Sequence, residues 1–183
     1  MDDPSADALR LPKQVVADPC GEALRTGLLA SRRMLWSGGS IAAPAAQLTP
    51  ELTRALRSAR SAGRVTRGLE QAAKALAGED KGLRLVDQRA ASKGAAARGE
   101  RVSRLLLLSN DGAERFYRHV ESLVRTNGPR VLALQLDVSA DDLGRAVLGG
   151  DASVRLLLVS HRESVANTLL SLSPQWTAGD VES

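Results

Sequence analysis

Residues 104–109 read RLLLLS, residues 130–136 read RVLALQL and residues 154–160 read VRLLLVS, and these short apolar runs decide the fold. Each run is nearly continuous rather than alternating, which is typical of a strand buried on both faces of a sheet. Amphipathic segments separate the runs. Such strands alternating with helices predict a three-layer α/β/α sandwich built on a small mixed sheet.

The helices between these runs have recognisable ends. Thr49 and Pro50 supply an N-cap and a first helical residue, which predicts a helix to about residue 60. Ser139, followed by an acid three residues later, resembles a capping box. We expect Asn110 and Asp111 to cap the helix that follows them. The remaining predicted helices cover residues 63–77, 112–125, 139–148 and 162–172.

The flanks of the predicted domain, residues 49–172, differ from it in composition. Prolines interrupt residues 1–48, so we expect an N-terminal extension with one docking helix over residues 21–36, followed by a flexible SGGS connector at 37–40. Residues 173–183 form a C-terminal tail. We predict that apolar side chains of both flanks pack on protein neighbours, namely Leu28, Trp36 and Trp176.

The segment GRVTRGLEQAAKAL, residues 63–76, has two possible roles. Its apolar residues recur at helical spacing, which predicts an amphipathic helix with one buried face: Val65, Leu69, Ala72, Ala73 and Leu76. Its first turn adds two arginines, Arg64 and Arg67, to the positive end of that helix. The periodicity leaves this first turn unexplained.

Residues 78–102 lack regular periodicity, and we treat them as a surface insertion with a short strand at 83–86. Residues 77–104 hold seven basic and four acidic residues, a balance of +3 in a chain of net charge +4. The insertion is either a solvated loop or a source of contacts to an RNA backbone. The candidate contacts are Lys81, Arg89, Lys93, Arg98 and Arg101.

The segment LGGDASV, residues 148–154, contains paired glycines whose backbone amides could receive an anion. It matches neither common nucleotide-binding glycine pattern, and it joins a helix to a strand instead of a strand to a helix. Two interpretations remain, a plain helix end with a turn or a loop that touches a partner. Its candidate residues are Gly149, Gly150, Asp151, Ala152 and Ser153.

Composition excludes several classes of protein and site. Aromatic residues make up 2% of the chain, too few for a base-stacking sheet. One cysteine, Cys20, allows no internal disulfide or multi-cysteine zinc site, and the apolar runs are too short for a membrane span. The acidic residues near the start argue against a secretory or organellar presequence. We expect no metal, no cofactor, no membrane and no small-molecule substrate.

The two histidines, His119 and His161, lack a nucleophile or an orienting carboxylate at a recognisable spacing. We expect His119 to be a partly buried structural residue on a helix. His161 follows a strand end, where α/β enzymes often carry catalytic groups, but no second group pairs with it. We therefore predict no catalytic residue and no enzyme activity, apart from a role as an accessory subunit of a ribonucleoprotein enzyme.

The order GRVTRGLEQAAKAL, RLLLLSND, helix, RVLALQL, SADDLGRAVLGG and VRLLLVS resembles the kink-turn RNA-binding superfamily of ribosomal proteins, snoRNP core proteins and the corresponding RNase P/MRP subunit. The resemblance covers residues 49–172 and is nearest to the RNase P/MRP subunit. In that family a Gly-x-Asn-Glu segment, followed by Val-Thr-Lys/Arg and an Ala-Leu/Val-Glu run, opens a helix whose first turn enters the RNA.

The resemblance implies an RNA-binding surface at this first turn, with the LGGDASV loop beside a flipped-out nucleotide. Val65, Thr66, Arg67, Leu69 and Glu70 match the family pattern, whereas Ser61, Gly63 and Arg64 replace its Gly, Asn and Glu. The family Asn and Glu bind the sheared G·A pairs of the kink-turn. The expected RNA-binding residues here are Gly63, Arg64, Thr66 and Arg67, with the loop and the insertion.

The resemblance implies a noncatalytic subunit of a ribonucleoprotein, either an RNase P/MRP-like particle or a ribosome. Structured RNA and the other protein subunits of the particle are the expected partners. Nuclear or nucleolar residence follows, with a cytoplasmic or mitochondrial ribosome as the alternative. Two other functions stay open: a protein-interaction module that has lost specific kink-turn binding, and a relative of the substrate domain of RNA ribose methyltransferases.

Overall fold

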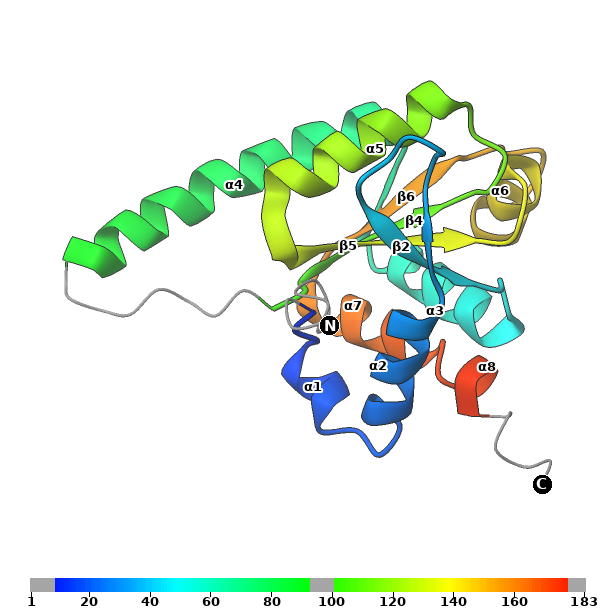
Figure 1. Ribbon diagram of the computed structural model, residues 1–183, viewed down its shortest axis with the longest axis horizontal. Coiled ribbons are helices and arrows are strands. Elements are labelled where there is room, and N and C mark those ends of the chain that lie inside the picture. Colours follow the sequence, from blue (N-terminus) through cyan, green and yellow to red (C-terminus); the bar gives the residue numbers. More distant parts are fainter. Residues whose placement is uncertain (1–8, 93–100, 178–183) are drawn as a thin grey trace.

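The computed structural model, which describes residues 9–92 and 101–177, is an α/β/α sandwich around a six-stranded mixed sheet of order β1-β2-β5-β4-β6-β3 (Figure 1). Strand β5 is parallel to β2 and β4, whereas the other pairings are antiparallel. The strands are β1 (Arg32–Met34), β2 (Ala42–Ala46), β3 (Val65–Arg67), β4 (Arg104–Leu108), β5 (Val131–Leu136) and β6 (Leu156–Val159).

The apolar runs form the centre of the sheet, as predicted. Strand β5 has the predicted bounds, and β6 begins two residues after the predicted start. Side chains alternate between the faces, so Leu105 and Leu107 enter one apolar cluster while Leu106 and Leu108 enter the other. Because helices cover both faces, these leucines are completely buried.

One face of the sheet packs against several short helices. Helix α3 begins as predicted, with the Thr49 hydroxyl accepting a hydrogen bond from Leu52 N–H, and α6 has the equivalent cap at Ser139. Leucines and valines of these helices form one core with the sheet. The helices are α1 (Lys13–Val16), α2 (Gly21–Ala30), α3 (Pro50–Ser61), α6 (Ala140–Leu148) and α7 (Arg162–Leu170), and α8 (Pro174–Thr177) lies beside α2.

The opposite face carries α4 (Leu69–Ser92) and α5 (Glu114–Asn127). The short 3-10 helix η1 (Gly128–Arg130) joins α5 to β5. The N-cap of α5 is Ala113, not the predicted Asn110 or Asp111. The carboxylate of Asp111 instead accepts a hydrogen bond from Ala140 N–H, 3.0 Å away, at the start of α6. Asp111 therefore caps α6, which is near it in space, instead of α5, which follows it in the sequence.

The prediction of one helix over residues 63–76 was wrong. Residues 65–67 form β3, which pairs with β6, and α4 begins only at Leu69 after Gly68 at φ +90°. Val65 packs in the core of the multi-helix face, whereas Leu69 packs in the core beneath α4. The helical spacing of Val65 with Leu69 was therefore coincidental.

The predicted insertion is in large part a continuation of α4. Residues 78–92 are helical, including the predicted strand at 83–86, and the helix projects beyond the sheet (Figure 1). Alanine, leucine and charged residues favour helix here, and an Asp80–Arg84 ion pair one turn apart supports it. Lys93 and Arg98 lie outside the described residues.

The N-terminal segment contributes strands as well as a docking helix. The predicted helix ends at Ala30, and β1 and β2 follow it into the sheet, joined by the SGGS segment. Pro44 lies where β2 stops pairing with β1 and begins pairing with β5. A proline is tolerated there because the ladder to β5 requires no N–H from it.

A buried carboxylate holds the turn between β1 and β2 against α5. Glu121 is 6% exposed and accepts hydrogen bonds from Trp36 Nε1 and from the backbone and hydroxyl of Ser40. Arg125 pairs with it at 2.9 Å. Burial by itself raises the pKa of Glu121, but these hydrogen bonds outweigh it and hold the pKa below its ordinary value.

Candidate functional site

The structure brings together two of the segments predicted to bind RNA. Arg67, the last residue of the edge strand β3, donates from Nη2 to the Ser153 carbonyl at 3.0 Å. Ser153 belongs to the predicted loop between α6 and β6. Because β3 pairs with β6, the end of β3 lies beside the start of β6 and the loop that precedes it.

Backbone geometry defines the shape of this loop, residues 149–153. Gly149 and Gly150 adopt φ values of +83° and +59°, which favour glycine. A Cβ on Gly144 of α6 would lie 2.1 Å from the Ala152 carbonyl oxygen, so the loop depends on glycine there to pack on the helix. Asp151 and Ser153 are exposed, and Ala152 is partly buried.

The predicted residues before β3 lie at the other end of the strand. Arg64 pairs with Glu163 Oε2 at 3.5 Å and donates to the Ser164 hydroxyl at 3.3 Å. Its carbonyl accepts a hydrogen bond from Ser160 N–H. Thr66 pairs with Leu158 inside the ladder and is partly buried, and Gly63 is exposed. These residues belong to a strand and its preceding turn, not to the positive end of a helix.

That positive end belongs to Gly68 and the residues after it. Gly68 N–H donates to Leu156 O, which ties the start of α4 to β6. Glu70 and Gln71 follow and are exposed. Glu70 lies 3.6 Å from Lys74, an exposed pair one turn along the helix.

Three further arginines near this edge were not predicted. Arg60 accepts the Gly63 N–H through its carbonyl, Arg155 precedes β6, and Arg162 begins α7 beside the partner of Arg64. All three are exposed. These three arginines lie far apart in the sequence, so no local pattern groups them with Arg64 and Arg67. Arg155, at the start of VRLLLVS, was the one that a sequence motif already contained.

One titratable group near this edge has a shifted pKa. Partial desolvation of Asp111 raises its pKa, but the hydrogen bond from Ala140 N–H and the charge of Arg155 act in the opposite direction, and the net pKa is lowered. Asp111 therefore stays ionised and holds the start of α6, the helix that leads into the loop.

The cations of the predicted insertion lie elsewhere. Lys81 and Arg89 are exposed on α4, whose far half projects away from the end of the sheet that carries α6 (Figure 1). Arg101 donates to the Leu11 carbonyl at 2.9 Å and helps to join the N-terminal segment to the start of β4. The described part of the insertion and the 149–153 loop do not form one surface.

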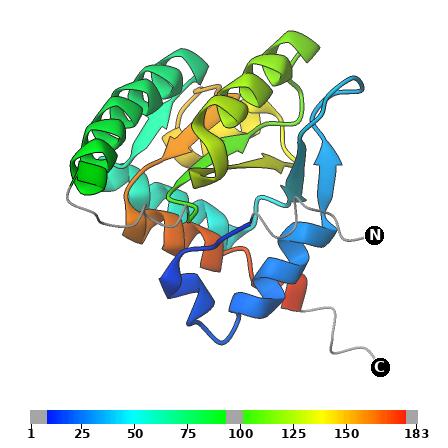
Figure 2. The same cartoon turned by 60° about the vertical axis from the view of Figure 1, so that its left-hand side comes forward.

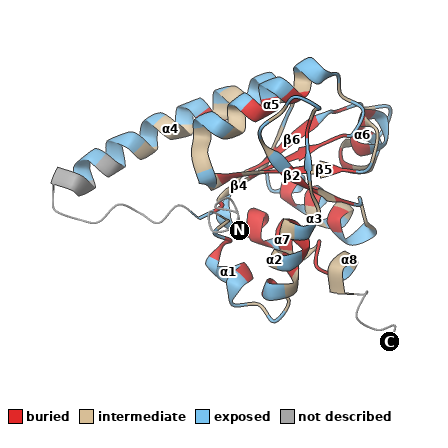
Figure 3. Ribbon diagram, in the orientation of Figure 1, coloured by how far each residue is buried: buried red, intermediate tan, exposed pale blue. Residues whose placement is uncertain are grey.

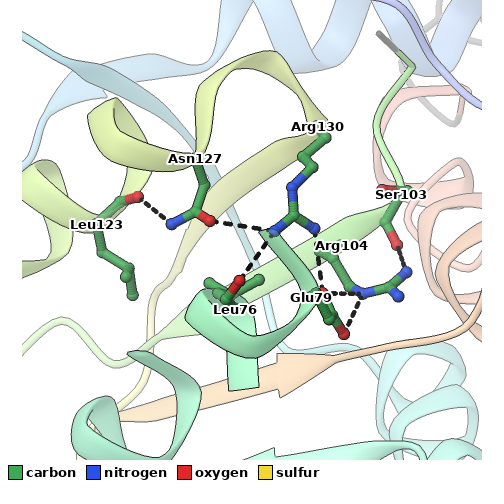
Figure 4. Close-up of polar contacts among 7 residues, drawn as sticks. All are labelled: Leu76, Glu79, Ser103, Arg104, Leu123, Asn127 and Arg130. Atoms are coloured by element: carbon green, nitrogen blue, oxygen red, sulfur yellow. Dashed lines mark hydrogen bonds and ion pairs between the residues drawn. The ribbon is translucent and has the colours of Figure 1, made fainter. Parts of the chain in front are cut away.

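A half-buried carboxylate anchors α4 where it leaves the sheet. Glu79 accepts hydrogen bonds from Arg104 Nε at 3.0 Å and from Arg130 Nη1 at 3.1 Å (Figure 4). Arg130 also donates to Leu76 O and to Asn127 Oδ1. These contacts join α4 to the starts of β4 and β5, which indicates a structural role for the cluster.

The predicted protein-interaction residues make contacts within the chain. Leu28 is completely buried in the core, so the prediction that it meets a partner was wrong. The Trp176 ring packs on α2, where a Cβ on Gly27 would lie 2.3 Å from it. Trp36 bonds Glu121, and the Arg118 guanidinium lies 4.7 Å from its ring centroid.

The described residues also bear on metal sites, membrane spans and the two histidines. Within ranges 9–92 and 101–177 there is no group of three or more His, Cys, Asp or Glu side chains placed to hold a metal ion. None of the helices in those ranges has the length and apolar character needed to span a membrane. His161 adopts φ +78° and accepts from Glu163 N–H, capping α7, and His119 is exposed on α5, not partly buried as predicted.

Comparisons with known proteins give the chain no family. No protein-family model and no curated protein matches it. The chain is similar to a solved structure of a protein of unknown function from Bacillus halodurans, with 17% sequence identity and a TM-score of 0.45. The match covers 69% of this chain and 99% of the other.

Proposed function

We propose that the chain is a noncatalytic RNA-binding subunit of a ribonucleoprotein, and that RNA binds at the β3 edge of the sheet. The observation that carries this proposal is the hydrogen bond between Arg67 and Ser153, which joins the arginine-bearing strand to the glycine loop. Arg60 and Arg162 add exposed positive charge near Arg64, through the Gly63 N–H to Arg60 O contact and the start of α7. Arginines contact phosphate oxygens well because their guanidinium forks donate several hydrogen bonds.

The first turn of α4 lies directly after β3, because α4 begins at Leu69 following Gly68 at φ +90°. Leu69 and Glu70 are the residues that match the Leu/Val-Glu part of the family pattern at the opening of a helix. Glu70 and Gln71 carry side-chain oxygens that can accept hydrogen bonds from base amino groups, so we propose them for base contacts.

Two groups of residues then have separable roles. Arg64 and Arg67 lie about 10 Å apart, the length of three strand residues, and we assign them to the phosphate backbone. Glu70 and Gln71, at the first turn of α4, are assigned to unpaired or sheared bases. The backbone contacts contribute affinity for any RNA, whereas the base contacts contribute preference for a kink-turn.

Fluorescence anisotropy against a kink-turn RNA, a plain duplex and a single strand, each at several salt concentrations, tests these roles. Replacing Arg64 and Arg67 by alanine should weaken binding to all three RNAs and reduce the slope of log K against log salt by about 2, one for each phosphate contact. Replacing Gln71 by alanine should weaken only the kink-turn complex, by about tenfold for one good base contact.

Arg33→Ala is the control for a single lost charge, because Arg33 is exposed on β1 at the opposite edge of the sheet and is compared with Arg64→Ala and Arg67→Ala made singly. It should leave the salt slope unchanged. Unaltered binding in the double arginine variant, or equal losses in the Arg33 variant, would rule out this site. Loss of backbone binding with no effect of Gln71→Ala would leave an RNA-binding face without kink-turn specificity.

A further inference from the structure

Helices α4 and α5 lie side by side on the face of the sheet away from the other helices (Figure 2). An open groove lies between their side chains. Its volume is about 740 Å³, and α4 lines it from Leu69 to Arg84. Fifteen helical rises separate those two residues, which gives about 22 Å, or four turns of a helix lying alongside. The α5 wall consists of His119, Ser122, Leu123, Thr126 and Asn127.

The floor of the groove consists of aliphatic and small side chains. Leu69 and Leu123 provide aliphatic surface, while Ala73 and Ala77, one turn apart on α4, leave room for another backbone to approach. Helices pack closely where small residues lie at such spacing, with axes 8–10 Å apart as a general rule. The shape suits the ridge of a third helix better than a bulky flat ligand.

The projecting half of α4 also carries two exposed apolar side chains, Leu85 at 57% and Val86 at 40% exposure. This half of α4 is mainly exposed in Figure 3. Val86 lies nine residues after Ala77, about half a turn round the helix, so these side chains are not an extension of the groove.

The charges around the groove favour an acidic partner. Glu70 pairs with Lys74, and Asp80 pairs with Arg84 at 3.0 Å, so both carboxylates on this side of α4 are neutralised. Lys81 on α4 and Arg115, one turn before His119 on α5, are exposed. Neither has an ion-pair partner among the carboxylates that the structure describes. Lys81 is thus a cation in the groove wall, and Arg115 lies one turn before the first groove residue of α5.

We propose that the α4–α5 groove binds an amphipathic helix of a protein partner, with an apolar stripe on Leu69, Ala73, Ala77 and Leu123 and acidic side chains facing Lys81 and Arg115. This helix-in-groove mode supplies affinity from the stripe and orientation from the charges. The groove excludes Arg64 and Arg67 of the β3 edge, but it begins at Leu69 and Glu70, beside the proposed base contacts, so the tests below vary residues further along α4 and α5.

Selection of a phage-displayed library of 20-residue helical peptides on the full-length chain tests this inference. Enriched peptides should carry large apolar residues at i, i+3, i+4 and i+7, flanked by Asp or Glu. Synthetic copies should bind Ala77→Arg at least about tenfold more weakly, because the new side chain fills the groove, whereas Ser58→Arg on the exposed side of α3 should change affinity less than about twofold.

Exchanging the charges of Lys81 and of the peptide tests whether the two attract each other. Lys81→Glu should weaken an acidic peptide about fivefold, and lysine in place of the peptide's acidic flank should restore the affinity. Ser122→Arg fills the groove from the α5 wall and repeats the Ala77 test if Ala77→Arg fails to fold by circular dichroism. NMR amide shifts on the labelled chain should concentrate at residues 69–84 and 115–127.

Several results would overturn the proposal. Enriched peptides without an acidic bias, no enriched peptides, or equal binding to Ala77→Arg and Ser122→Arg would each do so. Sedimentation that shows self-association lost in Ala77→Arg would make a second copy the occupant. RNA binding lost in Ala77→Arg but kept in Arg64→Ala/Arg67→Ala would make RNA the occupant.

Discussion

The two faces of the sheet are covered in different ways. Among the described residues, helices α1, α2, α3, α6 and α7 cover one face over a large cluster of buried leucine and valine side chains. In the same ranges α4 and α5 cover the other face over a smaller apolar cluster, with a groove between them. Two carboxylates, Glu79 and Glu121, hold parts of this second layer in place.

Replacing leucines on the two sides of β4 should produce the largest expected difference in the free energy of unfolding. Leu107 lies under the multi-helix face and Leu106 under α4 and α5, and both are completely buried. We expect Leu107→Ala to lower the free energy of unfolding by about 4 kcal/mol and Leu106→Ala by about 2.5 kcal/mol, because layers beside an open groove can relax into a cavity. Urea unfolding of both variants measures this, and equal losses would show that the two faces are packed equally well.

Glu121→Gln should produce the next largest effect, a loss of about 2 kcal/mol at neutral pH, because amide hydrogens would meet the donors of Ser40 and Trp36. The lowered pKa of Glu121 also gives the sign of a pH effect. Its stabilising contribution is complete above the unfolded-state pKa, near 4.5, and is lost as pH falls through the lower folded-state value.

Thermal unfolding between pH 7 and pH 3 checks this expectation, with Glu121→Gln losing less stability on acidification than the wild type. Glu114→Gln is the matched control, because Glu114 also pairs with an arginine one turn along α5 but is 53% exposed. It should change stability by less than about 0.5 kcal/mol. The same acid sensitivity in Glu121→Gln and wild type would contradict the role of this carboxylate.

Glu79→Gln should have the smallest of these effects, about 1 kcal/mol, because Glu79 is 28% exposed and its arginine partners keep other acceptors. The more informative measurement is local. Amide hydrogen exchange should accelerate in residues 76–92 of α4 while β4 and β5 stay protected, since the cluster anchors the helix where it leaves the sheet. Uniform acceleration across the whole chain would show that Glu79 stabilises the fold globally.

Local signals in the sequence predicted much of the fold. The apolar runs predicted β4, β5 and β6 because strands buried on both faces need continuous apolar side chains. Thr49 and Ser139 predicted the starts of two helices because a cap is a contact between residues three positions apart. The glycines at 149 and 150 predicted the end of α6, which stops at Leu148 with Gly149 as its C-cap.

The candidate site was predicted only in part. Arg64, Arg67 and the loop could be named from the sequence, but their meeting depends on β3 pairing with β6, whose partner residues lie 90 to 94 positions further along the chain. Three residues of a strand carry too little periodicity to separate them from the helix that follows. The groove was not predicted, because apolar spacing on α4 and α5 does not show which stripe remains uncovered.

The sequence by itself determined the sandwich, its central strands and the capped helices, since burial patterns and caps act over a few residues. Tertiary structure decided the rest. It moved residues 65–67 from a helix into an edge strand, placed Pro44 inside the sheet and turned the basic insertion into the projecting half of α4. Each of these outcomes depends on which distant segment lies alongside, and pairing across the sheet is not encoded by neighbours along the chain.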